Sequence, residues 1–206
     1  FEYAVAGQED CLENAQLAMR GAHQAANAAV ALATIAELRQ QGWCVSIDAM
    51  RHGLAQATLP GRVEFLPGQP NVVLDTAHNS ASAEALVNTL EEFPRTGRRT
   101  LILSVSHDKD VRAIVRELAS HFDRVVATQY QENPRAVPVG DLAELVRAEC
   151  GGKTGMRVEV CPTPREAWET VCGGAESSEL VCIAGSFYLA AELRPLVLAR
   201  QNAAAI

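Results

Sequence analysis

From about residue 70 onward, short apolar segments alternate with helical segments, and this alternation constrains the fold more than any other feature. The apolar segments fall at residues 72–74, 101–105, 125–127, 158–160 and 180–184. The helical patterns follow them at residues 81–93, 111–121, 139–149, 164–172 and 187–199. Continuous apolar strands that alternate with helices are typical of a parallel sheet covered on both faces. The sequence therefore predicts an α/β domain with a mostly parallel sheet over residues 58–206.

The region before this domain has a different spacing of apolar residues. Small apolar residues recur at helical spacing between residues 11 and 41, which predicts one long helix ending at Gly42. A shorter helix is expected from Ile47 to Ala57, followed by a loop at Leu59-Pro60-Gly61-Arg62 and a short strand at 63–66. We therefore expect residues 1–57 to be a helical segment that forms the edge of something larger.

The composition excludes several classes of protein. An apolar fraction of 48% and a charged fraction of 21% are those of an ordinary soluble globular chain. The formal net charge of −7 argues against a non-specific nucleic-acid binder, which needs surplus Lys and Arg to displace counterions. It does not exclude ATP, because ATP needs only one or two local cations and backbone N–H groups. No apolar run approaches the roughly 18 residues of a membrane span, so we expect no contact with a membrane.

Six cysteines occur, at positions 11, 44, 150, 161, 172 and 182. None forms a Cys-x-x-Cys pair, and no Cys/His cluster has zinc spacing. With no secretory signal at the start, we expect reduced thiols and a cytoplasmic location. The chain opens at Phe1 without a methionine, and we expect a processed or truncated sequence.

Polar clusters follow four of the expected strands. Ligands bind beyond the carboxyl ends of the strands in open parallel sheets, so these clusters predict a binding face at one sheet edge. The clusters are Asp75, His78 and Asn79; Ser106, His107, Asp108, Lys109 and Asp110; Glu132, Asn133 and Arg135; and Gly185 with Ser186.

Each cluster also has a purely structural interpretation. Asp75 is a candidate N-cap for the helix that begins near Ser80, and Asp108 is a candidate cap for the helix from Val111, because Asp is a favoured capping residue. His78 and Arg135 are equally compatible with solvated surface positions, and Gly185-Ser186 with a tight turn. No phosphate-binding Gly-x-x-x-x-Gly-Lys-Ser/Thr loop, Gly-x-Gly-x-x-Gly loop or Gly-x-Ser-x-Gly elbow occurs.

A further polar constellation lies within the first helical region. His23 and Asn27 are four residues apart amid alanines, which places them on one helix face. One interpretation is a hydrogen bond between helices. The other is an Asn that reads the edge of a planar base, since its amide both donates and accepts.

Taken together, these motifs resemble the C-terminal part of bifunctional folylpolyglutamate synthase/dihydrofolate synthase, a member of the Mur ligase superfamily. The matching motifs run in the family's order over nearly the whole chain. Two of them depart from the family pattern: Leu59 stands where the family has Trp, and Thr76 where it has Gly. The motifs are Gly21-x-His23-Gln24-x-x-Asn27-Ala28, Leu59-Pro60-Gly61-Arg62, Leu74-Asp75-Thr76-Ala77-His78-Asn79, His107-Asp108-Lys109-Asp110, Asn133-Pro134-Arg135-Ala136 and Gly185-Ser186-Phe187-Tyr188-Leu189.

The resemblance implies a Rossmann-like domain of the Mur ligase C-terminal type and an ATP-dependent ligase. Such an enzyme phosphorylates a carboxylate of dihydropteroate or folate, and the amino group of L-glutamate then attacks the acyl phosphate. The residues implied at the ATP site are Asn27 at the adenine, Arg62 and Asp75 at the ribose and phosphates, and His78 close by. The residues implied tentatively at the amino-acid or acyl-phosphate side are Asp108, Lys109, Asp110 and Arg135.

The resemblance also implies that half of the active site lies in another domain. The family's P-loop, its Lys and the ligands of Mg²⁺ belong to an N-terminal ATPase domain, and no P-loop occurs in these 206 residues. Phosphoryl transfer depends on such groups to neutralise developing charge. We therefore expect this chain alone to have no ligase activity, no catalytic residue of its own and no metal site, and to work with the P-loop domain of the same protein.

Two other functions stay open from the sequence. Another Mur-type amide ligase, acting on a peptidoglycan precursor, is compatible with Asn133-Pro134-Arg135, which resembles a motif that such ligases use on amino-acid substrates. A non-catalytic α/β binding module is the third interpretation, and it predicts that the loops after the strands do not converge.

Overall fold

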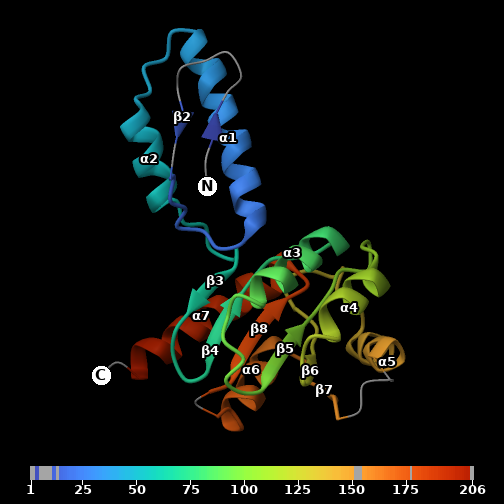
Figure 1. The fold of residues 1–206 in the computed structure, drawn as a ribbon. Coiled ribbons are helices and arrows are strands. Elements are labelled where there is room, and N and C mark those ends of the chain that lie inside the picture. The colour runs from blue at the N-terminus through green and yellow to red at the C-terminus, as the bar shows by residue number, and fades with distance from the viewer. Residues whose placement is uncertain (1–2, 5–10, 13, 151–154, 177, 205–206) are drawn as a thin grey trace. The chain divides into compact units, whose positions relative to one another are not determined.

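The computed structural model describes residues 3–4, 11–12, 14–150, 155–176 and 178–204 (Figure 1). The chain divides into two compact units, residues 1–60 and 61–206. Each unit has its own buried apolar residues, and each is described here by itself. Within the described part of the chain, no helix has the length and apolar character needed to cross a membrane.

The first unit contains helices α1 (Ala22–Gln40) and α2 (Ile47–Gln56) and a small antiparallel pair, β1 (Tyr3–Ala4) with β2 (Cys11–Leu12). The prediction of one helix over residues 11–41 is wrong for residues 11–21, because the helix begins only at Ala22. Gly21 precedes it with a φ of 98°, a left-handed conformation that only glycine adopts readily. Leu12 is nevertheless buried, and it packs with Leu32 and Met50. The apolar spacing therefore indicated the burial of Leu12, but not the local structure around it.

The second unit is built on a six-stranded sheet in the order β3-β4-β8-β5-β6-β7. All neighbouring strands are parallel except β3, which runs antiparallel to β4 at one edge. The prediction of a mostly parallel α/β sheet is therefore confirmed. The strands are β3 (Glu64–Leu66), β4 (Asn71–Leu74), β5 (Arg99–Leu103), β6 (Arg124–Ala127), β7 (Arg157–Val160) and β8 (Leu180–Ala184).

Helices cover both faces of this sheet, as the continuous apolar strands require (Figure 1). Helices α3, α4 and α5 pack on one face, and α6 and α7 pack on the other. Within β5, Leu101 and Leu103 face the first layer, whereas Ile102 faces the second. The helices are α3 (Ser80–Leu90), α4 (Val111–Ala119), α5 (Val139–Cys150), α6 (Pro164–Gly173) and α7 (Phe187–Ala204).

The carboxyl ends of the parallel strands meet at one edge of the sheet, and Gly185 ties them together. Its N–H donates to the carbonyl of Ala77 after β4, at 2.9 Å. A Cβ on Gly185 would lie 2.6 Å from the carbonyl oxygen of Ser104 after β5, and the residue has a φ of 103°. Only glycine fits such a close approach in this conformation. The loops that follow β4, β5 and β8 are thereby brought side by side.

Candidate functional site

The structure distributes the residues singled out from the sequence over both units. Arg62, Asp75 and His78 lie in the α/β unit, around the end of β4. Asp108, Lys109, Asp110 and Arg135 lie in the same unit, after β5 and β6. Asn27 lies on α1 of the first unit. The convergence of loops at one sheet edge argues against the interpretation in which the polar clusters are scattered.

Asp75 is buried, and its carboxylate is held by the backbone on both sides. Oδ2 accepts a hydrogen bond from the N–H of Val63, and Oδ1 accepts one from the N–H of Ala77, each at 2.7 Å. Asp75 therefore does not cap the following helix. Asn79 does so, because its side chain accepts from the N–H of Ser82 in a reciprocal capping box.

The loop that carries Arg62 is anchored at each end by these bonds. The carbonyl of Gly61 accepts from the N–H of Thr76 at 2.9 Å, and Asp75 holds Val63 on the other side. Val63 has a φ of 45°, which is strained for a β-branched residue and persists only where the surroundings impose it. The Arg62 side chain is exposed and has no hydrogen-bond or ion-pair partner among the described residues.

Glu64 supports the same loop. One of its carboxylate oxygens accepts from the N–H of Gly61 at 2.9 Å, and the carboxylate forms a forked ion pair with Arg194 of α7, 2.7 Å at its closest. Burial raises the pKa of Glu64, but the hydrogen bonds from Arg194 and Gly61 together with the charge of Arg194 lower it to a net value below the ordinary one. Helix α7 therefore also positions Arg62.

His78 presents one ring nitrogen outward. Its Nδ1 lies 2.9 Å from the carbonyl oxygen of Thr76. Because a carbonyl only accepts, this bond requires the proton on Nδ1, which leaves Nε2 of the neutral ring as an acceptor. The ring is half-buried, so His78 is not merely a solvated loop residue.

Changing Asp75 to Asn is expected to lower the free energy of unfolding by about 1–3 kcal/mol, because the amide NH₂ faces one of the two backbone donors and leaves it unpaired. Urea denaturation of this chain measures the change. Glu84→Gln, on the exposed side of α3, is the isosteric control and is expected to change stability by less than about 0.5 kcal/mol. Equal effects of the two variants would contradict the anchoring role of Asp75.

Asp108, Lys109 and Arg135 form a second cluster, at the ends of β5 and β6. Oδ2 of Asp108 lies 3.4 Å from Lys109 Nζ and 3.7 Å from Arg135 Nη1. Desolvation raises the pKa of Asp108, but its own backbone N–H and the neighbouring Lys109 and Arg135 outweigh this and lower it. Asp110 differs from them, because its carboxylate accepts from the N–H of Ala113 and caps α4. The predicted cap, Asp108, was the wrong residue.

Backbone hydrogen bonds connect the two loops of this cluster, one after β5 and one after β6. Ser106 and Ala136 form an isolated antiparallel bridge, and the N–H of His107 donates to the carbonyl of Arg135 at 2.8 Å. The Arg135 side chain, although exposed, donates from Nη2 to the hydroxyl of Tyr188 at 2.7 Å. The Arg135 guanidinium is therefore held by a hydrogen bond and is not freely solvated.

On α1, Gln24 links the two residues predicted from the sequence. Its Nε2 lies 3.1 Å from His23 Nε2, and its Oε1 accepts from Asn27 Nδ2 at 3.0 Å. Gln24 is buried, whereas Asn27 is exposed. These recorded bonds run along one helix, so they do not match the predicted bond between helices.

Sequence reasoning missed three residues that position the site: Glu64, Tyr130 and Tyr188. Both tyrosines stand just beyond a buried strand end, and that placement was an available signal. The role of Glu64 depends on Arg194, which is 130 residues away in sequence, so no local sequence pattern predicts this role.

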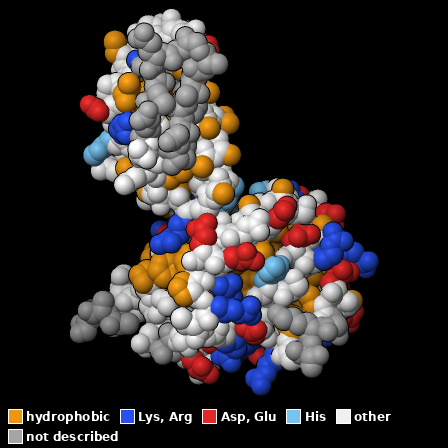
Figure 2. All heavy atoms as spheres, in the orientation of Figure 1, with side chains coloured by type: hydrophobic (Ala, Val, Ile, Leu, Met, Phe, Trp, Pro, Cys, Tyr) orange, Lys and Arg blue, Asp and Glu red, His pale blue; other side chains and the backbone are white. Residues whose placement is uncertain are grey.

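The charges around the site are mixed. Figure 2 shows acidic and basic side chains interspersed over the visible face of the α/β unit. Within the described ranges, no group of three or more His, Cys, Asp or Glu side chains is gathered to hold a metal ion. The described residues therefore do not fit a metal centre, and we derive no metal chemistry from them.

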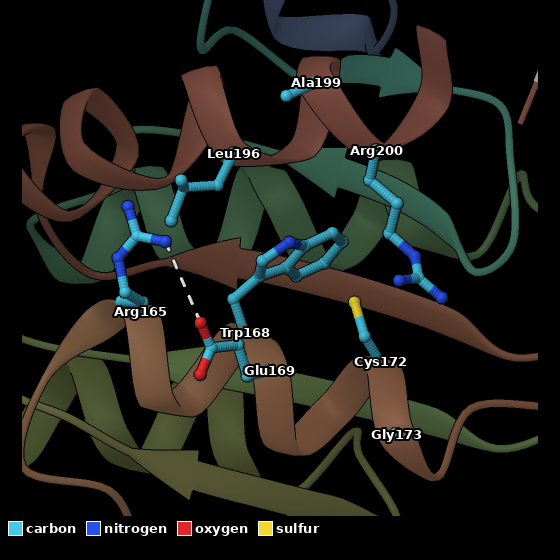
Figure 3. Close-up of a pocket in the computed structure, with 8 residues that line it drawn as sticks. All are labelled: Arg165, Trp168, Glu169, Cys172, Gly173, Leu196, Ala199 and Arg200. Carbon is cyan, nitrogen blue, oxygen red and sulfur yellow. Dashed lines mark ion pairs between the residues drawn. The ribbon is translucent and has the colours of Figure 1, made fainter. Parts of the chain in front are cut away.

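Two cavities lined by described residues lie on the α6–α7 side of the sheet. Neither is lined by the residues that the resemblance assigns to ATP or to the amino acid, although Glu132 of the third polar cluster lines one of them. One, of about 560 Å³, opens between α6 and α7, with the Trp168 ring between the two helices and Cys172 at its wall (Figure 3). The other, of about 520 Å³, reaches from α6 to Tyr188. We place the site at the sheet edge instead, because Arg62 and Arg135 lie there. Their side chains are exposed, and hydrogen bonds hold the backbone that carries them.

Comparisons with known proteins give one consistent set of matches. Residues 61–187 match the family described as Mur ligase, glutamate ligase domain. The chain is 33% identical over 177 residues to the dihydrofolate synthase/folylpolyglutamate synthase of Escherichia coli, covering 85% of this chain and 39% of that protein.

Solved structures give the same result. A Mycobacterium tuberculosis folylpolyglutamate synthase complexed with ADP superposes with a TM-score of 0.80 at 33% identity, covering 91% of this chain and 42% of that one. A bifunctional folylpolyglutamate synthase/dihydrofolate synthase with Mn, AMPPNP and L-glutamate bound gives a TM-score of 0.75 at 28% identity, with coverages of 91% and 42%. The chain thus spans about two fifths of the length of these relatives.

Proposed function

We infer the function from one premise: the chain belongs to the Mur ligase family, as a glutamate ligase domain that corresponds to the C-terminal part of folylpolyglutamate/dihydrofolate synthases. We propose that it forms one side of the active site of an ATP-dependent ligase that adds L-glutamate to dihydropteroate or folate. We also propose that residues 1–57 complete an N-terminal ATPase domain of the same protein, and that residues 58–206 are the glutamate-ligase domain.

The proposed reaction proceeds in two chemical steps. A carboxylate oxygen of the folate substrate attacks the γ-phosphorus of ATP, so that an acyl phosphate forms and ADP leaves. The glutamate nitrogen then attacks the acyl carbon, phosphate leaves with the bonding pair, and the nitrogen loses a proton. The P-loop and the groups that bind Mg²⁺ belong to the N-terminal domain in this proposal. The relatives solved with ADP, or with AMPPNP and Mn, support the proposed use of ATP and a divalent metal.

The single observation that carries the proposal is the fixed presentation of Arg62. Its loop is strained at Val63 and pinned by Asp75, yet its guanidinium is exposed and has no partner among the described residues. An Arg held in this way offers a charge-assisted fork to phosphate oxygens. We therefore assign Arg62 to the ATP phosphates.

The remaining nucleotide contacts are assigned by their chemistry. We assign Asp75 to the ribose, because a carboxylate accepts hydrogen bonds from hydroxyl groups. His78 Nε2 is a further acceptor beside it. Asn27, exposed on α1, offers an amide to the adenine edge.

The amino-acid side of the site is assigned to the second cluster. Arg135 suits a carboxylate of glutamate, and Asp108 with its lowered pKa suits the substrate amine. Lys109 beside them suits the acyl phosphate or a second carboxylate. Asp110 is proposed only to fix the start of α4, because its carboxylate is engaged there.

This chain alone is expected to show no ligase turnover and only weak ATP binding, since the P-loop half of the site is missing. The measurement is product formation from ATP, dihydropteroate and L-glutamate by this chain, with calorimetric titration of ATP alongside. Turnover by this chain, or a sub-micromolar dissociation constant for ATP, would show that the division of the site between two domains is wrong.

A further inference from the structure

We propose that Tyr188 is a positioning residue that, together with Asn133, turns the guanidinium of Arg135 so that its outer N–H groups face a carboxylate of the amino-acid substrate. This inference rests on the proposed function, because it assumes that Arg135 meets that substrate. It assigns to the residues after β8 a part in substrate selection.

A guanidinium has five N–H donors and two edges on which a carboxylate can dock. The edge formed by Nε and Nη2 of Arg135 is already engaged. Nε donates to Oδ1 of Asn133 at 3.2 Å, and Nη2 donates to the hydroxyl of Tyr188 at 2.7 Å. Two neutral oxygens therefore occupy the edge without cancelling the positive charge.

The other edge, formed by Nη1 and the second N–H of Nη2, remains for a ligand. Its nearest recorded anion is Oδ2 of Asp108, 3.7 Å from Nη1, which is longer than a hydrogen bond. An incoming carboxylate can approach this edge in the planar, two-bond arrangement that Arg favours. Asp108 then stands beside the bound carboxylate, where the amine of an amino acid would be attracted to it.

Tyr188 is itself held in place by residues that follow strands of the sheet. Its ring centroid lies 5.2 Å from that of Tyr130, which is 1% exposed, and the Tyr130 hydroxyl lies 2.6 Å from Oγ of Ser106. The guanidinium carbon of Arg135 lies 5.5 Å from the Tyr188 ring centroid, within reach of a cation–π contact. The orientation of Arg135 is thus set by side chains from the segments that follow three different strands: Ser106 after β5, Tyr130 and Asn133 after β6, and Tyr188 on α7 after β8.

A tie that only stabilised the fold would lower the amount of folded enzyme, and with it the apparent kcat, but would leave KM for glutamate unchanged. The orienting role predicts a different result. Removing the hydroxyl while keeping the ring should weaken glutamate binding, leave ATP binding intact, and matter only while Arg is present at position 135.

The test is steady-state kinetics on the full-length ligase with Tyr188→Phe, Arg135→Lys and the double variant. Tyr188→Phe is expected to raise KM for glutamate about tenfold, the order of a lost hydrogen bond to a charged group, with kcat and KM for ATP within about twofold. In the Arg135→Lys background the same change should cost less than about twofold, because Lys has no fork to orient. Phe187→Ala, at the exposed neighbouring position, is the matched control and should leave KM for glutamate unchanged.

A second measurement uses glutamine and the α-amide of glutamate, which remove one carboxylate charge each. The analogue that lacks the carboxylate held by Arg135 should bind poorly and should not respond to Tyr188→Phe. An equal Tyr188→Phe penalty in both Arg135 backgrounds, or none in either, overturns the inference. If Arg135→Ala itself leaves KM for glutamate unchanged, the proposed glutamate site fails instead, so the two failures are distinguishable.

Discussion

Replacing Arg135 with Ala in the full-length ligase is expected to lower kcat/KM for glutamate about 100-fold or more. Truncating one partner of a charged, hydrogen-bonded contact costs about 2–5 kcal/mol, and each 1.4 kcal/mol is about tenfold. The loss should appear mainly in KM for glutamate, because Arg135 is assigned to binding and not to phosphoryl transfer. Kinetics with varied glutamate at saturating ATP and folate substrate measure it.

The matched control for this variant is Arg165→Ala on α6. Arg165 is also an exposed arginine of the α/β unit, but it pairs with Glu169 one helical turn away and lies outside the cluster. Its replacement is expected to change kcat/KM for glutamate less than about twofold. If Arg135→Ala behaved like Arg165→Ala, the assignment of the amino-acid site would be wrong.

The largest effect on stability is expected from Arg98→Ala, at the opposite ends of the strands. Arg98 pairs at 2.6 Å with Glu179, which is fully buried and also accepts from the hydroxyl of Thr100. Removing the cation leaves a buried carboxylate without its counter-charge, which costs about 3–5 kcal/mol. Urea denaturation at pH 7 measures the loss, and Glu169→Ala, in an exposed pair, is expected to cost less than about 0.5 kcal/mol.

The same pair predicts a pH dependence. Burial raises the pKa of Glu179, but Arg98, Thr100 and the Glu176 amide together hold it below its ordinary value of 4.5. A lowered folded-state pKa contributes stability that is present above the unfolded value and is lost as the pH falls through the folded one. Arg98→Ala removes the cation that lowers this pKa, so below about pH 4.5 the original chain should lose stability that the variant no longer has, and the gap between the two should narrow. A stability gap that stayed constant down to pH 3 would contradict this account.

The sequence was sufficient for the α/β architecture because the inner strands β4, β8, β5 and β6 are buried on both faces. A run such as Leu101-Ile102-Leu103 sends alternate side chains into two different helical layers, and only a covered sheet needs apolar residues at every position. Residues 11–21 were misassigned because apolar spacing also arises in a buried non-helical segment. Gly21, with its left-handed backbone, was the local sign that the helix begins later.

The candidate site was partly readable from the sequence. The strand-end rule located Asp75 and Asp108, but their neighbours Asn79 and Asp110 cap the helices instead. A helix is capped by the carboxyl or amide group that reaches the N–H groups of its first turn. Two nearby residues of a favoured type can each be in range, and only the backbone geometry decides which of them caps the helix. The two tyrosines that support Arg135 lie far apart in the chain, Tyr130 after β6 and Tyr188 on α7, so spacing did not reveal them.

The most direct test of the central claim is acceptor-dependent product formation by the full-length protein. It would be incubated with ATP, L-glutamate and either dihydropteroate or a uridine-linked peptidoglycan peptide, and the products measured by mass spectrometry together with ADP release. With dihydropteroate we expect ADP release and a product enlarged by one glutamate residue, and with the uridine-linked peptide we expect neither. Product with the uridine-linked peptide alone, or with neither acceptor, would contradict it.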